Sequence, residues 1–314
     1  MGTDIDVLVI GAGVSGLTTA ICVAEAGLRV HVRAARPPQQ TTSVAASAMV
    51  GPLIYDRDDR RRTWGEATTR ELVGPPGAPG VHLTRGLLAA RPDGFLPPHA
   101  DEIPGFDLCR PDELPSGFGT GFWATLPLVD MPVYLDYLVE RLHTAGAEIE
   151  MASVESLAEA AALAPAVVNC SGLGARELAG DPDVRPVRGP KVVVENPGID
   201  TFFMEAPIGP TWVAYLPHRD HVVLGGRASE YDENLEPDPA EEAEILRACA
   251  EIEPRLAGAR VLEHRVGLRP GRAEVRLEPE MIDGSLCVHN YGHGGEGVVF
   301  SWGCARDVLT LLQR

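Results

Sequence analysis

Two glycine-rich segments have residue types and spacing suited to holding a phosphate-bearing ligand. One is GAGVSG at residues 11–16, and the other is CVHNYGHGGEGVVFSWGCA at residues 287–305. Glycine lets a ligand approach the backbone closely, and the N–H groups of such turns and of helix N-termini bind anions. The chemistry that these segments indicate is that of a bound cofactor.

The first segment stands between a buried strand expected at residues 5–10 and a helix expected at residues 14–26. A second strand follows at residues 28–33, which completes an opening βαβ unit. Gly11 would permit the tight turn, Gly13 the approach of a pyrophosphate, and Gly16 close helix–strand packing. This context predicts dinucleotide binding; the alternative is a glycine turn in an α/β domain without a ligand.

The acid that usually bonds the ribose about 20 residues further on is absent. No Asp or Glu occurs between Glu25 and Asp56, and the second strand ends in RAAR, with Arg33 and Arg36. Alone, these arginines favour a 2′-phosphate and hence NADP. The competing interpretation is FAD, whose ribose another group would hold. The first loop leaves both open.

The second segment argues for the longer cofactor. Gly292, Gly294, Gly295 and Gly297 lie between the last expected strand and the closing helix, which begins near Gly297. These glycines would open the backbone to a planar ring, and the positive end of the helix would stabilise an anionic reduced flavin. A turn shaped only by packing is the alternative.

The remaining elements must bring these segments together. Further helices are expected at 64–73, from 131 and at 239–254; buried strands at 164–175, 187–194 and 211–225; and turns between short strands at 74–130. We predict an α/β fold: a Rossmann-type FAD-binding domain of discontinuous segments (1–50, 131–182, 281–314) interleaved with a β-rich substrate domain (51–130, 183–280).

Composition narrows the class of protein. The chain of 314 residues has a net charge of −18, which disfavours nucleic acid and anionic membranes as partners. Six cysteines without CxxC spacing argue against zinc and disulfides, and no metal is expected. There is neither a long apolar run nor a signal peptide, so a cytoplasmic protein is expected. The chain ends in LLQR rather than a peroxisomal SKL signal.

With these residues in place, the sequence resembles the D-amino-acid oxidase family. Besides the 287–305 segment, the similar segments are TTSVAAS (41–47), VYLDYLVERL (133–142), VVNCSGLGA (167–175), RPVRG (185–189) and HRVGLRPGRAEVRLE (264–278). The similarity runs from about residue 5 to residue 310. It implies FAD as cofactor and a D-amino acid and O₂ as small-molecule partners. Flavin N5 would take the Cα hydrogen as hydride, yielding a 2-oxo acid, ammonia and H₂O₂. The oligomeric state stays open, with a homodimer as one option.

The resemblance also implies site residues. Arg269 in GLRPGR matches the carboxylate-binding arginine; by itself it could be one of four solvated strand arginines. The carbonyl of Gly295 would accept from the substrate amine. Tyr215 stands two residues before Pro217 rather than three, so either the strand has a bulge or Tyr215 faces elsewhere. Expected cofactor contacts are Gly11, Ala12, Gly13, Val14, Ser15, Gly16, Arg36, Thr41, Thr42, Ser43, Ala46, Ser47, Ala48, Val154, Ser171, Gly172, Gly292, Gly294, Gly295, Glu296, Gly297 and Val298.

Two points stay open at this level. Glu296 departs from the aromatic or small residues common there; it could pair with an arginine or favour neutral and basic substrates. The alternative activities are oxidation of glycine or N-methyl amino acids, a dehydrogenase that does not use O₂, and a flavin-bound sensor without turnover. The charged segment DRDDRRR (56–62) is interpreted as a solvated turn.

Overall fold

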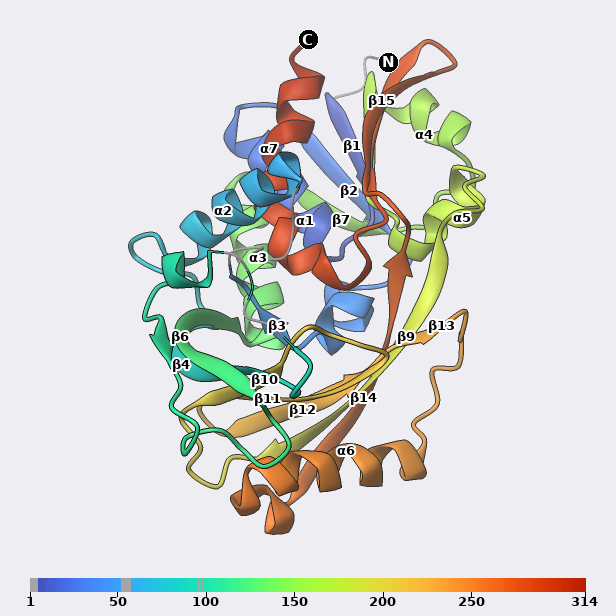
Figure 1. Ribbon diagram of the computed structural model, residues 1–314. Helices are drawn as coiled ribbons and strands as arrows, with labels where there is room; N and C mark the ends of the chain where they lie inside the picture. Colours follow the sequence, from blue (N-terminus) through green and yellow to red (C-terminus); the bar gives the residue numbers. More distant parts are fainter. Residues whose placement is uncertain (1–4, 52–57, 95–96, 98) are drawn as a thin grey trace.

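The computed structural model describes residues 5–51, 58–94, 97 and 99–314. The described strands form two sheets, which lie in the upper and lower halves of Figure 1. The C-terminus lies at the upper end, and helix α6 (Pro239–Ile252) covers the lower sheet from below. Among the described residues, none of the helices combines the length and the apolar run that crossing a bilayer requires.

The first sheet is mainly parallel. Its order is β15-β16-β8-β1-β2-β7, and only the edge strand β15 is antiparallel to its neighbour. Helices pack on both of its faces, which is why all four residues of the short β1 are buried. Its strands are β1 (Val7–Ile10), β2 (Val30–Ala34), β7 (Glu148–Met151), β8 (Ala166–Asn169), β15 (Arg276–Ile282) and β16 (Ser285–Tyr291).

Helices α1 (Val14–Glu25), α3 (Met131–Thr144) and α7 (Gly297–Leu312) share a core on one face of this sheet, and α4 (Leu157–Leu163) packs on the other. Helix α2 (Asp59–Val73) joins the first group by packing on α7. A Cβ at Gly303 would overlap the backbone of Trp64, so glycine there lets the two helices approach. The indole N–H of Trp302 donates to the Tyr134 hydroxyl at 2.7 Å.

The second sheet is mostly antiparallel. Its order is β13-β9-β12-β11-β10-β4-β6-β3, with β14 also paired to β9 and β5 to β6. These strands are β3 (Ala48–Met49), β4 (Val81–Ala90), β5 (Asp107–Leu108), β6 (Thr120–Val129), β9 (Arg185–Glu195), β10 (Phe202–Glu205), β11 (Thr211–Pro217), β12 (His221–Arg227), β13 (Ser229–Glu230) and β14 (Val261–Gly271). Helix α5 (Ala175–Leu178) is a single turn after β8.

Two sequence-based expectations need correction. Residues 74–130 hold two ten-residue strands, β4 and β6, rather than only short strands between turns. The described part of the charged segment, from Asp58 on, starts helix α2 instead of forming a turn: Asp58 accepts from the Arg60 N–H at 2.8 Å as its N-cap. The first two residues of that segment lie outside the described residues.

The predicted domain boundaries remain a prediction. Three elements do not lie with the segments to which the prediction assigned them. Helix α2, placed with the substrate domain, packs on α7; β3 (Ala48–Met49) pairs with β6 of the second sheet; and β15 begins before the predicted boundary at residue 281.

Candidate cofactor and substrate site

Three glycine turns meet at one edge of the first sheet. They follow β1, β8 and β16, which are adjacent and parallel, so their carboxyl ends point the same way. The register places Ile10 level with Asn169, and Asn169 level with His289. Ligands of doubly wound sheets bind beyond the carboxyl ends of the strands, and this edge is therefore the candidate cofactor site.

The geometry of GAGVSG accounts for its glycines. Gly11 has a φ of +104°, and a Cβ there would lie 2.5 Å from the carbonyl oxygen of Cys170. A Cβ at Gly16 would overlap the carbonyl of Gly11, so the third glycine lets α1 pack on the turn. No acidic residue stands in the first turn of α1, and its N-cap, Gly13, has no side chain to cap it. The positive end of α1 is thus suited to an anion.

The segment expected to contact the cofactor joins this turn to the second sheet. Ser43 Oγ accepts from the Val14 N–H at 2.9 Å, and Thr42 Oγ1 donates to the carbonyl of Leu268 at 3.0 Å. A Cβ at Gly267 would lie 3.0 Å from Cβ of Ala45. Residues 41–48 therefore lie between α1 and strand β14. The other predicted contacts here, Thr41, Ala46, Ser47 and Ala48, belong to the same segment.

Buried polar side chains hold the glycine turns in place, and the sequence reasoning missed them. Asn169 Oδ1 accepts from the backbone N–H and the hydroxyl of Ser171, at 3.2 and 2.6 Å. Asn290 Nδ2 donates to Thr19 of α1 at 3.1 Å, and its Oδ1 lies 3.1 Å from Nε2 of His293. Burial lowers the pKa of His293 to about 4, so its imidazole is neutral near pH 7. The sequence feature that could have identified Asn290 and His293 is their spacing in N-Y-G-H, directly before the glycine turn.

The second glycine turn leaves room for a ligand. Gly294 has a φ of +56° and Gly172, in the neighbouring turn, +58°; a Cβ at Gly294 would meet nothing within 4 Å, and one at Gly172 only Pro270 at 4.0 Å. No side chain among the described residues caps the N-terminus of α7. Its N-cap residue, Glu296, pairs with Arg61 of α2 at 2.5 Å. This contact matches one of the two roles considered for Glu296.

The two arginines near the end of β2, Arg33 within the strand and Arg36 just beyond it, differ in their surroundings. Arg33 lies beside Glu150 of β7 at 2.7 Å and Glu159 at 3.7 Å, so two carboxylates balance its charge. This weakens the case for a 2′-phosphate at Arg33. Arg36 is exposed, and Val154, the predicted contact after β7, is partly buried.

Arg269 of β14 lies where the two sheets meet. Its side chain is largely buried, and burial lowers its pKa. Nη1 donates to the carbonyls of Arg188 and Arg227, both at 3.3 Å, and no carboxylate of the described residues pairs with it. A Cβ at Gly295 would lie 3.6 Å from Cδ of Arg269. The structure thus brings together the two residues predicted to bind the substrate carboxylate and amine.

Lys191 of β9, the only lysine of the chain, is a second cation on this side of the sheet. Burial, with the charge of Arg269 as a lesser cause, lowers its pKa to about 7. Nζ lies 5.4 Å from the ring centroid of Trp212, and a Cβ at Gly225 would overlap it. The only feature of the sequence that could have singled out Lys191 is that the chain has no other lysine.

The prediction that Tyr215 contacts the substrate is not supported by its position. The strand has the register shift considered above, between Thr211 and Ala214, yet Tyr215 still points away from Arg269. Its ring stacks on Phe203 at 5.8 Å in the core shared with α6, and burial raises its pKa. The neighbouring Ala214 lies opposite Gly225, whose α-carbon faces Lys191.

Comparison with known proteins places this arrangement in context. The sequence model of the family described as FAD dependent oxidoreductase matches residues 6–311. D-amino-acid oxidase from Rubrobacter xylanophilus is 47% identical, with 97% of this chain and 94% of that protein covered. The Streptomyces coelicolor protein of the same name is 45% identical, covering 98% and 97%. The structure of glycine oxidase from Geobacillus kaustophilus matches 99% of this chain and 95% of that one, with a TM-score of 0.83 and 18% identity.

Proposed function

The chain belongs to the D-amino-acid oxidase family of FAD-dependent oxidoreductases, and we propose that it deaminates D-amino acids oxidatively. The products are a 2-oxo acid and ammonia, with O₂ as the electron acceptor and H₂O₂ as its product. The observation that carries the proposal is the partly buried guanidinium of Arg269 beside Gly295, without a carboxylate partner among the described residues.

The residues at the carboxyl edge of the first sheet fit FAD. Two helix N-termini without side-chain caps, those of α1 and α7, stand behind glycine turns, and a Cβ at Gly294 would enter open space. The first turn, with Gly11 and Gly13, would hold the pyrophosphate, and the second, at 292–297, the ring. When bound, FAD supplies the acceptor for the electron pair of the substrate Cα–H bond.

The chain's own residues bind and orient the substrate. Arg269 presents a planar fork that matches a carboxylate, and its burial strengthens this contact by excluding water. Gly295 would accept a hydrogen bond from the substrate amine through its carbonyl. When it is protonated, Lys191 adds positive charge beside Arg269. A bound substrate carboxylate therefore favours the protonated form of the Lys191 amine. A substrate held through both its carboxylate and its amine presents one face of Cα to the cofactor.

A substrate panel with peroxide detection tests the proposal. The purified holoenzyme is supplied with D- and L-forms of alanine, valine, lysine and aspartate, and with glycine and sarcosine; H₂O₂ and the 2-oxo acid are measured together. We expect H₂O₂ and 2-oxo acid in equal amounts from D-forms only. Higher kcat/KM for glycine or sarcosine would favour the alternative activity, and 2-oxo acid without H₂O₂ would indicate a dehydrogenase.

A further inference from the structure

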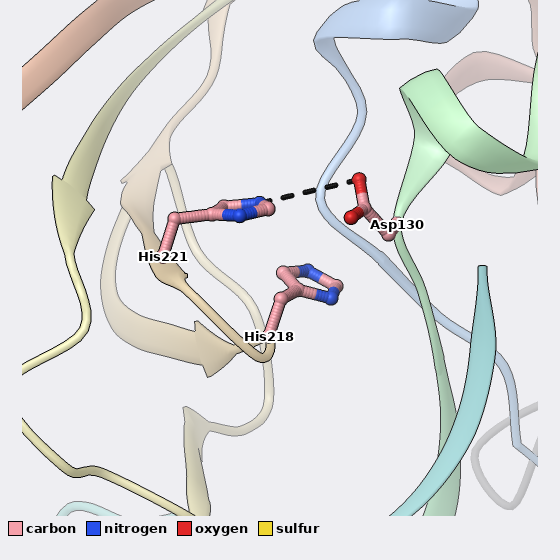
Figure 2. Close-up of side chains that lie close together, drawn as sticks. All are labelled: Asp130, His218 and His221. Atoms are coloured by element: carbon pink, nitrogen blue, oxygen red, sulfur yellow. Dashed lines mark ion pairs between the residues drawn. The ribbon is translucent and has the colours of Figure 1, made fainter.

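A cluster of two histidines and one aspartate stands where α3 meets the turn between β11 and β12. Asp130 is the residue between β6 and α3, and His218 and His221 are the two ends of the turn. Figure 2 shows the three side chains converging, with His221 directed at Asp130. One ligand atom from each lies within 4.8 Å of the others. None of them belongs to the glycine turns or the carboxylate site.

Asp130 occupies the N-cap position of α3 without capping the helix. Aspartate at this position ordinarily accepts a hydrogen bond from the first turn. Here the side chain makes no such bond, and the carboxylate lies 4.0 Å from Nε2 of His221 instead. The Asp130 carboxylate therefore does not cap the helix and faces the two imidazoles instead.

His221 is oriented as a ligand histidine. Its Nδ1 lies 2.8 Å from Asp220 Oδ1, so Nδ1 donates to that carboxylate and Nε2 is the ring nitrogen directed at the cluster. That Nε2 is buried and has no hydrogen-bond partner among the described residues. A carboxylate behind the second ring nitrogen is the usual arrangement around metal-binding histidines.

His218 is the third member of the cluster, and of the three residues it alone is buried. Only 5% of the residue is exposed, and its Nδ1 is buried without a hydrogen-bond partner in the described part of the chain. Its ring stacks on His221 at 4.8 Å, and the ring of His82 packs edge-on at 5.1 Å. A buried imidazole nitrogen without a partner is unfavourable, and a ligand that accepts its lone pair would relieve that cost.

We propose that Asp130, His218 and His221 bind a divalent transition-metal ion of the Zn²⁺ class. Two imidazoles and one carboxylate suit Zn²⁺, Co²⁺, Ni²⁺ or Cu²⁺, whereas Mg²⁺ and Ca²⁺ prefer oxygen ligands. Zn–N and Zn–O bonds are about 2.0–2.2 Å, so the present spacing needs a side-chain shift of about an ångström to close on one ion. Three protein ligands leave a fourth position for water.

The bound ion would act on stability rather than on turnover. It would join the start of α3, which packs on the first sheet, to the β11–β12 turn of the second. The flavin and carboxylate sites are built from other residues. Metal binding should therefore raise the unfolding temperature while leaving the flavin spectrum and kcat/KM with D-alanine unchanged.

The experiment uses the full-length holoenzyme without a polyhistidine tag. Zn²⁺ binding is measured by equilibrium dialysis with metal analysis, and Co²⁺ binding by its visible absorption, for wild type, Asp130→Asn and His221→Gln. The matched control is His143→Gln, an exposed histidine on the same helix α3. Equal flavin content per chain shows that each variant is folded.

We expect one Zn²⁺ per chain in wild type and in His143→Gln, a higher unfolding temperature on its addition, and tetrahedral Co²⁺ absorption. Asp130→Asn and His221→Gln should bind Zn²⁺ at least about tenfold more weakly, because the loss of even an outer-shell partner of a metal ligand costs about 10- to 100-fold in affinity. The proposal is overturned if wild type binds no stoichiometric Zn²⁺, or if both ligand variants bind it as wild type does.

Discussion

The guanidinium of Arg269 lies across the α-carbon of Gly189, at a spot that a Cβ would occupy. The two residues lie diagonally across paired strands: Gly267 is level with Gly189, and Arg269 is level with Val187. Because residue 189 is glycine, the side chain of Arg269 lies flat on strand β9, and its Cδ and Nε lie near Gly295. The position of the carboxylate-binding group therefore depends on a residue that does not contact substrate.

Gly189→Ala should move the Arg269 side chain. The methyl group would overlap the guanidinium, and overpacking of this kind costs about 1–3 kcal/mol. If the cost falls on substrate binding, kcat/KM for D-alanine drops about 10- to 100-fold, mainly through KM. Steady-state kinetics checks this against Gly258→Ala, where a Cβ meets nothing within 4 Å. Unchanged KM in Gly189→Ala would mean that Arg269 has another acceptable position.

Lys191 should make stability depend on pH in a defined direction. Its pKa falls from the ordinary 10.5 to about 7 in the folded protein, so between these values the unfolded chain binds more protons. Stability of wild type relative to Lys191→Met must then rise with pH across this window, by at most about 1.4 kcal/mol per pH unit. Below about pH 7 the amine is charged in both states and the cost of burying it is fully present.

Urea unfolding of both proteins at pH 6, 7, 8 and 9 measures this difference. We expect the free energy of unfolding of Lys191→Met, relative to that of wild type, to be highest at pH 6. Above pH 7 the stability of wild type should rise steadily relative to that of the variant. A difference that stays constant with pH would show that Lys191 is not buried as a titrating amine. Lys191→Met should also raise KM for D-alanine most at the lower pH values, where the lost charge would have been present.

Glu296→Gln should shift substrate preference. The carboxylate at the N-terminus of α7 pairs with Arg61, and its removal makes the surroundings of the neighbouring Gly295 more positive. Because the pair is partly exposed, the effect is at most about 1 kcal/mol, or about fivefold in the ratio of kcat/KM for D-aspartate over D-alanine. Competition assays measure that ratio, with the exposed Glu148→Gln as control. Wild type that turns over D-aspartate as well as D-alanine or D-lysine contradicts this role.

Tyr215→Phe should leave catalysis nearly unchanged. The ring lies in the core shared with α6 and stacks on Phe203, on the opposite face from Arg269. We expect kcat/KM within about twofold of wild type. A hydroxyl bonded to a substrate carboxylate would contribute about 1.5–3 kcal/mol, so a KM increase of tenfold or more in this variant would restore Tyr215 to the site.

The glycine turns were predictable because their residue types are tied to local backbone geometry. Gly11 needs a positive φ and Gly16 needs close packing, and both requirements can be read from one strand–turn–helix segment. The same holds for Gly294 at +56°. That these turns lie side by side follows from the parallel order of β16, β8 and β1.

Contacts that depend on strand pairing were not predictable from local patterns. Lys191 faces the site only because of the register between β9 and β14, and Tyr215 lies on the other face despite a bulge in its own strand. A shift of one residue reverses every side chain of a strand. The cluster at Asp130 joins segments almost 90 residues apart, and the search for metal ligands by cysteine spacing could not find it.

The most direct test of the central claim is anaerobic reduction of the purified holoenzyme by D-alanine, followed by its visible spectrum. We expect a yellow protein whose oxidised flavin absorption is lost with D-alanine, is unaffected by L-alanine, and returns on admitting O₂ with one H₂O₂ per flavin. Arg269→Met should keep the flavin but need at least about 100-fold more D-alanine, because a buried charged contact is lost. A colourless protein, or a flavin spectrum that no D-amino acid changes, would contradict the proposed function.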